Sequence, residues 1–426
     1  MKNEYDICII GCGPAAIGMI SKFMMNNFGK SIICIDAGAE IIDRKCRYLE
    51  NKECISCDRC NMIHGVGGCA LLSSGKISNY PAGSKLKDIL GGEEETKKIL
   101  NDSIKMIQKE LPLKLVEINP NVTKEMKELF YTNDIIFKYY DVYKFSHSNL
   151  KQALNKLKIQ ALEYGIDFLT KELVIDIVKG NTFFEVITES HRIKANKVVL
   201  AVGKTGSSLL KRTQTLTYLD AEDNTIDIGV RFELPDKYIN KLEKIHGDIK
   251  LKYKNIRTYC YSSRGKVASY KLNNHSFTEG FSDIELDTNR TNFALLLRVD
   301  SSESVYKSIL EWYNNRKSSN IYQSNLIDFL NDNKNFISEI LTDTYIEELK
   351  EVINIFLKKI LDYDDYKNIE VFGPEMDIVA KKFQCDSNFS VNTNLYMIGA
   401  CLGQFRGILQ AYTSGVKCAD HIMEEI

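Results

Sequence analysis

The stretch Tyr5–Asp36 reads YDICIIGCGPAAIGMISKFMMNNFGKSIICID. Its pattern predicts a short apolar strand, a glycine turn, a helix and a second strand that ends in an acidic residue. The turn, Gly11–Ala16, is a G-x-G-x-x-A variant that follows a strand and opens a helix, which is the context that this motif requires. The stretch therefore predicts a βαβ unit that binds an adenine dinucleotide. The alternative is a structural unit without a ligand.

Each small residue of this turn has a physical reason. Gly11 permits the tight turn, Gly13 lets backbone N–H groups approach a pyrophosphate, and Ala16 lets the helix lie close to the strand. The phosphates would lie at the helix N-terminus, where unpaired amides and the helix dipole favour anions. A carboxylate at Asp36 is placed to accept hydrogen bonds from ribose hydroxyls. The expected ligand contacts in this stretch are Gly11, Gly13, Pro14, Ala15, Ala16 and Asp36.

The composition of the 426 residues, 44% hydrophobic and 27% charged, is that of a soluble globular protein with room for two or three domains. A net charge of −1 gives no indication of a nucleic-acid or membrane partner. No run of about 18 apolar residues occurs, and the glycine turn starts too early for a signal peptide to precede it. We therefore expect a cytoplasmic protein. Twelve cysteines then favour metal binding or thiol chemistry over a disulfide framework.

Four cysteines follow the second strand closely: Cys46, Cys54, Cys57 and Cys60, spaced C-x7-C-x2-C-x2-C. The C-x2-C-x2-C core resembles loops whose thiolates bind an iron–sulfur cluster. Four thiolates also suit tetrahedral zinc. A dithiol/disulfide relay and incidental thiols are the remaining interpretations. We expect a metal centre on these four residues, either a [4Fe-4S] cluster or zinc.

Three later segments add candidates for ligand contact. Gly65–Lys76 is a glycine-rich loop, which lets backbone approach a planar or anionic ligand. Lys194–Gly203 reads as a buried strand that ends in small residues, and Leu395–Ala400 as a strand followed by a turn and a closing helix. The N-terminal amides of that helix favour anionic groups. The candidate contacts in these segments are Gly67, Gly68, Ser73, Gly75, Ala201, Gly203, Gly399, Gly403, Arg406, Gly407 and Ile408.

The remaining periodicities predict an α/β fold with an inserted region. A helix at 146–164 precedes three strands, at 167–170, 173–179 and 182–188, which we expect to form an antiparallel meander. Further strands are predicted at 226–233, 256–261 and 292–299, and a mostly helical part at 300–366. The expected organisation is a three-layer Rossmann-like cofactor domain in three parts (1–85 with the cysteine-rich loop 46–60, 146–211 and 367–426), a helical insertion at 86–145 and an α+β substrate or cap domain at 212–366.

Taken together, these segments resemble an uncharacterised family of FAD-dependent dehydrogenases with a G-x-G-x-x-[AG] start, a cysteine- and glycine-rich loop and a C-terminal glycine strand. The resemblance spans nearly the whole chain and includes the blocks Ile226–Glu233 and Arg257-Thr258-Tyr259-Cys260. It implies a glutathione-reductase-like FAD-binding domain, with the ADP half of FAD on Tyr5–Asp36. It also implies an oxidoreductase activity on an unidentified small molecule.

An FAD oxidoreductase would exchange a hydride with its substrate at the junction of the two domains. Lys76 and Arg406 are candidates to stabilise negative charge on a reduced flavin. Cys260 is the candidate catalytic thiol, because Arg257 and Arg264 beside it would lower its pKa. The alternative for Cys260 is a buried structural cysteine.

The expected partners follow from this interpretation. One dinucleotide fingerprint is visible, so reducing equivalents would come from the cysteine-bound centre, an external donor or the substrate itself. We expect a small-molecule substrate, no nucleic acid and no membrane. The competing hypotheses are a flavin-binding redox sensor and a flavin-dependent tRNA-modifying enzyme, for which the lysine density of 237–254 is the sequence sign.

Overall fold

The opening stretch forms the expected strand–helix–strand unit in the computed structural model. β1 (Glu4–Ile10) leads through the glycine turn into α1 (Pro14–Met25), and β2 (Ile32–Asp36) runs parallel to β1. Every residue of β2 is buried, which is typical of a strand inside a parallel sheet that is covered on both faces. The structure describes residues 2–131, 134–206, 209–210, 219–272, 275–315, 321–332, 336–360, 366–379 and 381–425.

The first sheet is mostly parallel and is built around β1. Its order is β21-β22-β10-β1-β2-β7. The parallel neighbours of the opening unit are β10 (Arg192–Leu200) beside β1 and β7 (Ile166–Thr170) beside β2. β22 (Leu395–Met397) pairs parallel with β10, and β21 (Ser390–Asn392) pairs antiparallel with β22 at the edge.

The predicted three-stranded meander is wrong in one respect. β7 joins the parallel sheet. Only β8 (Val174–Lys179) and β9 (Phe184–Thr188) pair antiparallel with each other, and β9 also pairs antiparallel with β10. The physical reason is that parallel pairing beside β2 gives β7 a backbone partner over its whole length, from Ile166 to Thr170. A short connection alone therefore did not decide which strands pair.

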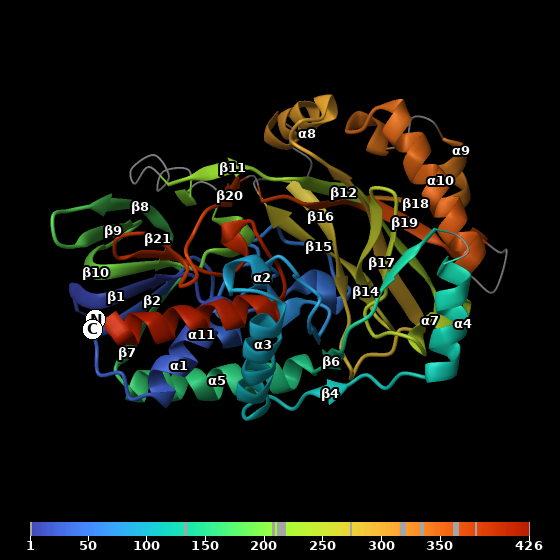
Figure 1. Cartoon of the computed structure of the whole chain (residues 1–426). Helices are drawn as coiled ribbons and strands as arrows, with labels where there is room; N and C mark the ends of the chain where they lie inside the picture. The colour runs from blue at the N-terminus through green and yellow to red at the C-terminus, as the bar shows by residue number, and fades with distance from the viewer. Residues whose placement is uncertain are drawn as a thin grey trace.

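Helices cover one face of this sheet, and the β8–β9 hairpin lies on the other side (Figure 1). The helices are α1, α5 (His147–Glu163) and α11 (Ile408–Glu425). α1 and α11 approach so closely that neither helix has room for a Cβ at the contact. A Cβ at Gly18 would lie 2.2 Å from the Tyr412 carbonyl oxygen, and one at Gly415 would lie 1.9 Å from the Ala15 carbonyl oxygen. The predicted α/β class with a three-layer Rossmann-like domain is confirmed.

A second, fully antiparallel sheet forms the other half of the described structure. Its order is β18-β19-β12-β17-β14-β13-β5, and its inner face packs into a separate apolar core. The helices α8, α9 and α10 lie at its outer end (Figure 1). The bounds are β5 (Ile136–Lys138), β12 (Ile226–Pro235), β13 (Lys250–Tyr253), β14 (Ile256–Ser262), β17 (Arg290–Val299), β18 (Tyr322–Asn325), β19 (Glu370–Asp377), α8 (Ser304–Asn315), α9 (Leu326–Asn331) and α10 (Asp343–Ile360).

The smaller elements belong to neither of the two large sheets. The hairpin of β15 (Lys266–Leu272) and β16 (His275–Phe281) extends from the second sheet toward the first. The other elements are β3 (Lys76–Ser78), β4 (Lys114–Leu115), β6 (Val142–Lys144), β11 (Ala221–Asp223), β20 (Lys381–Phe383), α2 (Leu86–Ile89), α3 (Glu93–Gln108), α4 (Pro120–Tyr131) and α7 (Asn240–Glu243). Within the described ranges, no helix is both long and apolar enough to cross a membrane.

Two strands pair in a different sheet from the one that the predicted organisation implies. β5 falls within the segment 86–145, predicted as a helical insertion, yet it pairs with β13 in the second sheet. β19 falls within 367–426, predicted as cofactor domain, yet it pairs with β12. Backbone hydrogen bonding therefore places both strands in the antiparallel sheet. The predicted boundary between 211 and 212 lies outside the described residues.

Candidate functional site

A cavity of about 670 Å³ lies at the carboxyl ends of β1, β2, β10 and β22 and extends to the second sheet. In open α/β sheets, ligands bind in the crevice outside these strand ends. Ala16, Gly67 and Gly75 are not part of its lining. The predicted residues that do line it are Gly11, Gly13, Pro14, Ala15, Asp36, Gly68, Ser73, Lys76, Ala201, Gly203, Cys260, Gly399, Gly403, Arg406, Gly407 and Ile408.

The two glycines of the turn have different roles. Gly11 has φ +100°, and a Cβ there would lie 2.4 Å from the Ala201 carbonyl oxygen, so glycine is required by the approach of β10. A Cβ at Gly13 would meet the Gly68 Cα at 3.7 Å, which is an ordinary contact. The protein itself has room for a methyl group at Gly13, so this glycine leaves space in the cavity that a ligand can use. Ala16, in the first turn of α1, is fully buried.

The Asp36 carboxylate joins three parts of the chain at the cavity wall. Its Oδ2 accepts the Cys12 N–H at 2.8 Å, and its Oδ1 accepts the N–H groups of Gly38 and Gly65 at 2.8 Å each. A carboxylate offers about four lone-pair sites, so one remains on Oδ2. Asp36 can therefore hold the surrounding backbone and still accept one further hydrogen bond.

The glycine-rich loop is fixed by Arg44, which the sequence interpretation missed. The buried Arg44 guanidinium donates to the carbonyl groups of Asn61 at 2.7 Å, Val66 at 2.8 Å and Gly68 at 2.7 Å. Gly68 has φ +56°, and a Cβ there would lie 2.9 Å from the Gly13 Cα. The loop therefore lies directly against the glycine turn and closes that side of the cavity.

Two glycines of this loop serve packing and not the predicted cofactor contact. Gly67 has φ +90° and a Cβ there would lie 2.7 Å from Leu154 Cδ1, on the side of a second, apolar cavity of about 430 Å³. Gly75 has φ +58° and a Cβ there would lie 2.9 Å from the Ser282 carbonyl oxygen. Both positions need glycine because backbone or core side chains fill the space. Ser73, in contrast, lines the main cavity.

The C-terminal turn brings a second helix N-terminus to the cavity. Gly407, with φ +117°, immediately precedes α11, and Ile408 begins that helix. Neither α1 nor α11 has an acidic residue in its first turn, and α1 begins without a side-chain cap. Unpaired amides at helix N-termini favour anions. The two helix starts, with Gly13 and Gly407 before them, therefore form an anion-attracting wall.

Lys76 lines the cavity in an ion pair. Its Nζ lies 2.7 Å from Asp248 Oδ1 and also donates to the Tyr261 carbonyl group. The Tyr140 hydroxyl donates to Asp248 Oδ2 at 2.7 Å. Burial raises the pKa of Asp248, but the nearby ammonium groups of Lys250 and Lys76 outweigh it and hold that pKa well below its usual range. Asp248 is therefore ionised and fixes the Lys76 ammonium at the wall.

The predicted activation of Cys260 is wrong. Cys260 lies on β14 and lines the cavity, but burial raises the pKa of its thiol. The two arginines expected to lower that pKa are engaged with other carboxylates, Arg257 with Asp227 at 2.5 Å and Arg264 with Asp287 at 3.3 Å. The thiol therefore stays protonated near neutral pH, when it is a poor nucleophile.

Arg406 belongs to a cluster of charges at the cavity wall. Its guanidinium contacts Asp227 Oδ2 at 3.2 Å and also binds Asp377. Asp227 is fully buried and binds Arg298 at 2.9 Å and Arg257 at 2.5 Å. Burial raises the pKa of Asp227, yet the surrounding arginines hold it well below its usual range. Three guanidinium groups against two carboxylates leave this cluster with one positive charge in excess.

The structure does not support the predicted metal centre. Among the described residues, which include Cys46, Cys54, Cys57 and Cys60, no group of side chains is arranged to hold a metal ion. Cys54 is exposed, whereas the Cys60 sulfur accepts the Lys271 N–H at 3.4 Å. Burial raises the pKa of the Cys46 and Cys60 thiols. The four thiols therefore lie in different surroundings within the loop.

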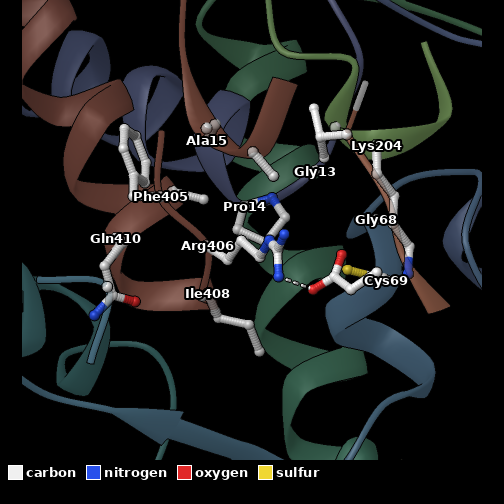
Figure 2. Close-up of a pocket in the computed structure, with 18 of the residues that line it drawn as sticks. Gly13, Pro14, Ala15, Gly68, Cys69, Lys204, Phe405, Arg406, Ile408 and Gln410 are labelled. Atoms are coloured by element: carbon white, nitrogen blue, oxygen red, sulfur yellow. Dashed lines mark hydrogen bonds and ion pairs between the residues drawn. The ribbon is translucent and has the colours of Figure 1, made fainter. Parts of the chain in front are cut away.

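Lys204 is the cavity residue whose omission from the predicted site matters most. Its Nζ donates to the Tyr270 hydroxyl at 3.0 Å and lies 4.4 Å from the centre of that ring. Figure 2 shows Lys204 and Cys69 on the same side of the cavity as Gly68, with Arg406 between them and the start of α11. A lysine directly after the small residues that end β10 was the available sequence signal.

No protein-family model matches the chain, and no curated protein matches its sequence. Solved structures match it at low identity. A glycine oxidase from Geobacillus kaustophilus is 10% identical, with a TM-score of 0.42 over 100% of this chain and 95% of that one. A geranylgeranyl bacteriochlorophyll reductase-like protein from Thermoplasma acidophilum is 12% identical, with a TM-score of 0.44 over 99% and 78%. The halogenase PltM is 10% identical, with a TM-score of 0.46 over 99% and 69%.

Proposed function

We propose that this chain is an FAD-dependent oxidoreductase that acts on a small molecule. The observation that carries the proposal is one cavity that reaches from the glycine turn after β1 to the charged strands of the second sheet. Its volume of about 670 Å³ lies in the usual range for cofactor and substrate sites, roughly 300–1,000 Å³. The proposal assigns the dinucleotide to the side of this space at the glycine turn and the substrate to the side formed by the second sheet.

The residues present fit the ADP half of FAD. The starts of α1 and α11 offer backbone amides to a pyrophosphate, and Gly13 leaves the space that such a group needs. Asp36 keeps one acceptor site for a ribose hydroxyl. This fit is of two independent kinds, steric at Gly13 and electrostatic at the helix starts, and both meet in the same cavity.

FAD, when bound, supplies hydride exchange with a substrate, and the chain supplies orientation and fixed charge. Lys204 and Arg406 line the cavity as held cations, which favour any negative charge that develops beside them. Lys76 has the same capacity but is already balanced by Asp248. Cys260 keeps its proton, so we assign it a contact role in the cavity and not a nucleophilic one.

The first test is the cofactor itself. The purified chain should show flavin absorption bands, and acid should release FAD at about one molecule per chain, identified by chromatography. A chain that neither retains FAD nor takes it up when the cofactor is added would overturn the proposal. The Gly13→Ala variant, described in the Discussion, controls for flavin that binds elsewhere.

The second test is turnover. Under anaerobic conditions the bound flavin should be bleached by a donor such as NADH, NADPH or an organic substrate and reoxidised over many cycles by an acceptor. Bleaching that stops after one equivalent with every acceptor tried would contradict an enzymatic role and favour the redox-sensor hypothesis. The two tests separate cofactor binding from catalysis.

A further inference from the structure

Three neighbouring strands of the second sheet place four cations on one side of the cavity. We name Lys138, Lys250, Lys252 and Arg257 the basic strip; all four line the cavity. Lys250 is the antiparallel partner of Lys138 across β13 and β5, and Lys252 is the partner of Arg257 across β13 and β14. Residues two apart on a strand share a face, so Lys250 and Lys252 point to the same side of the sheet. The strip is thus a continuous feature of the sheet.

The pairing within the basic strip is unfavourable in the empty protein. Like charges directly opposite each other on neighbouring strands destabilise a sheet. The strip contains two such pairs in succession, Lys138 with Lys250 and Lys252 with Arg257. Lys138 and Lys252 are exposed at the solvent side of the cavity, whereas Lys250 and Arg257 are half-buried in its wall. Water therefore screens the two pairs only in part, and an anion in the cavity would relieve the remaining repulsion.

The protein's own carboxylates compensate only part of this charge. Asp248 lies 3.8 Å from Lys250 but is nearer to Lys76, at 2.7 Å. Asp227 pairs with Arg257 within the arginine cluster described above. Among the residues that the structure describes, Lys138 and Lys252 form no ion pair. These two exposed ammonium groups at the solvent side of the cavity are accessible to an anionic ligand.

The state of Lys250 agrees with this excess. Burial lowers the pKa of Lys250; Asp248 opposes that change, but Arg257 and Lys76 add to it. The side chain is 23% exposed, so water screens it only in part. An anion beside Lys250 would oppose this lowering of its pKa.

We propose that the basic strip binds the anionic group of the substrate, a carboxylate or a phosphate. The proposal rests on the proposed function and names the substrate class of that same cavity. The cofactor phosphates have their own place at the starts of α1 and α11, so the strip on β5, β13 and β14 is available to a second anion. A small organic anion suits the strip better than RNA, because all four residues line the cavity and two of them, Lys250 and Arg257, are half-buried in its wall.

The test uses the FAD-loaded chain and two probes, succinate and inorganic phosphate, with succinamide as the uncharged control. Binding is followed by calorimetry and by the change in flavin absorbance. The variant is Lys250→Gln/Lys252→Gln, and the matched control is Lys307→Gln on the exposed surface of α8. We expect one or both anions to bind, and the double variant to bind roughly tenfold or more weakly than the control.

Stability gives a second readout that a structural role would not produce. Removing Lys252 alone takes away one like-charge pair, so Lys252→Gln should raise the melting temperature of the ligand-free chain while it weakens anion binding. A fall in melting temperature with unchanged anion affinity would mean that the strip serves only packing and would overturn the proposal.

The remaining outcomes are also distinct. Equal affinity of the double variant and the Lys307→Gln control for succinate and phosphate would overturn the proposal while FAD binding, measured separately, leaves the proposed function intact. Binding of a single-stranded RNA oligonucleotide that neither small anion displaces would overturn it in favour of RNA. Failure of the chain to bind FAD at all would instead count against the proposed function.

Discussion

Replacing Gly13 with alanine separates a ligand-binding role from a structural role at the glycine turn. Gly13 has φ −81°, which alanine readily adopts, and the added methyl group would meet the Gly68 Cα at 3.7 Å. The small loss expected at a helix N-cap is offset by the lower entropy of the unfolded chain. We therefore expect the free energy of unfolding of the cofactor-free variant to change by less than about 1 kcal/mol.

The same methyl group would occupy the space proposed for the pyrophosphate of FAD. A hydrogen bond to a charged group contributes about 1.5–3 kcal/mol. Displacing the phosphate enough to lose one such bond should raise the Kd for FAD roughly 10- to 150-fold. The assay is titration of the cofactor-free chain with FAD, followed by flavin fluorescence, with urea unfolding measured on the same preparations.

Gly11→Ala is the matched control, because it adds the same methyl group two residues away. Gly11 has φ +100°, and its Cβ would lie 2.4 Å from the Ala201 carbonyl oxygen, so this variant should lose stability. The expected pattern is a stable Gly13→Ala variant that binds FAD weakly and an unstable Gly11→Ala variant. Wild-type affinity of Gly13→Ala for FAD would refute the assignment of this space to a phosphate.

Three further predictions concern the second sheet and the cysteine loop. Glu375→Gln should lower the free energy of unfolding in urea by about 3–5 kcal/mol. The fully buried Arg231 lies 2.7 Å from the Glu375 carboxylate and would lose this charged partner. The double variant Arg231→Met/Glu375→Leu should recover most of that loss. The folded-state pKa of Asp248 is depressed, so its contribution to the free energy of unfolding is present above the usual carboxyl pKa of about 4 and is lost as the pH falls below that value. Asp248→Asn should therefore flatten the acid side of a plot of stability against pH. Iodoacetamide near neutral pH should alkylate the exposed Cys54 before Cys60, whose thiol pKa is raised by burial, and peptide mass spectrometry showing equal rates would contradict this.

The local parts of the fold were predictable because each depends on neighbouring residues. The predicted strand–turn–helix–strand of Tyr5–Asp36 matches β1, α1 and β2, and the predicted helix at 146–164 matches α5 within a residue at each end. The strand predicted at 226–233 is the central part of β12. Hydrophobic period and turn chemistry determine such elements without reference to distant parts of the chain.

The composition of the site was predictable only in part, because its charges meet through long-range pairing. Lys138 and Lys250 are 112 residues apart and become neighbours only when β5 pairs with β13. Lys76 and Asp248 are joined in the same way. The prediction of a low pKa for Cys260 was wrong for a related reason. Arg257 is close to Cys260 in the sequence, but the sequence did not show that Arg257 pairs with Asp227. The alternation of Lys250 and Lys252 was the one local sign of the basic strip.

The hydrogen bonds of Asp36 have a consequence for the stretch that follows it. This carboxylate holds the N–H of Gly65, and Arg44 fixes the backbone on both sides of that glycine, so the loop 46–60 is closed at its far end by the wall of the cavity. A ligand that binds the folded wall stabilises it against local opening. A ligand in the cavity should therefore slow proteolytic cleavage within 46–60. The rate of cleavage in this cysteine-rich loop would then show whether the cavity is occupied.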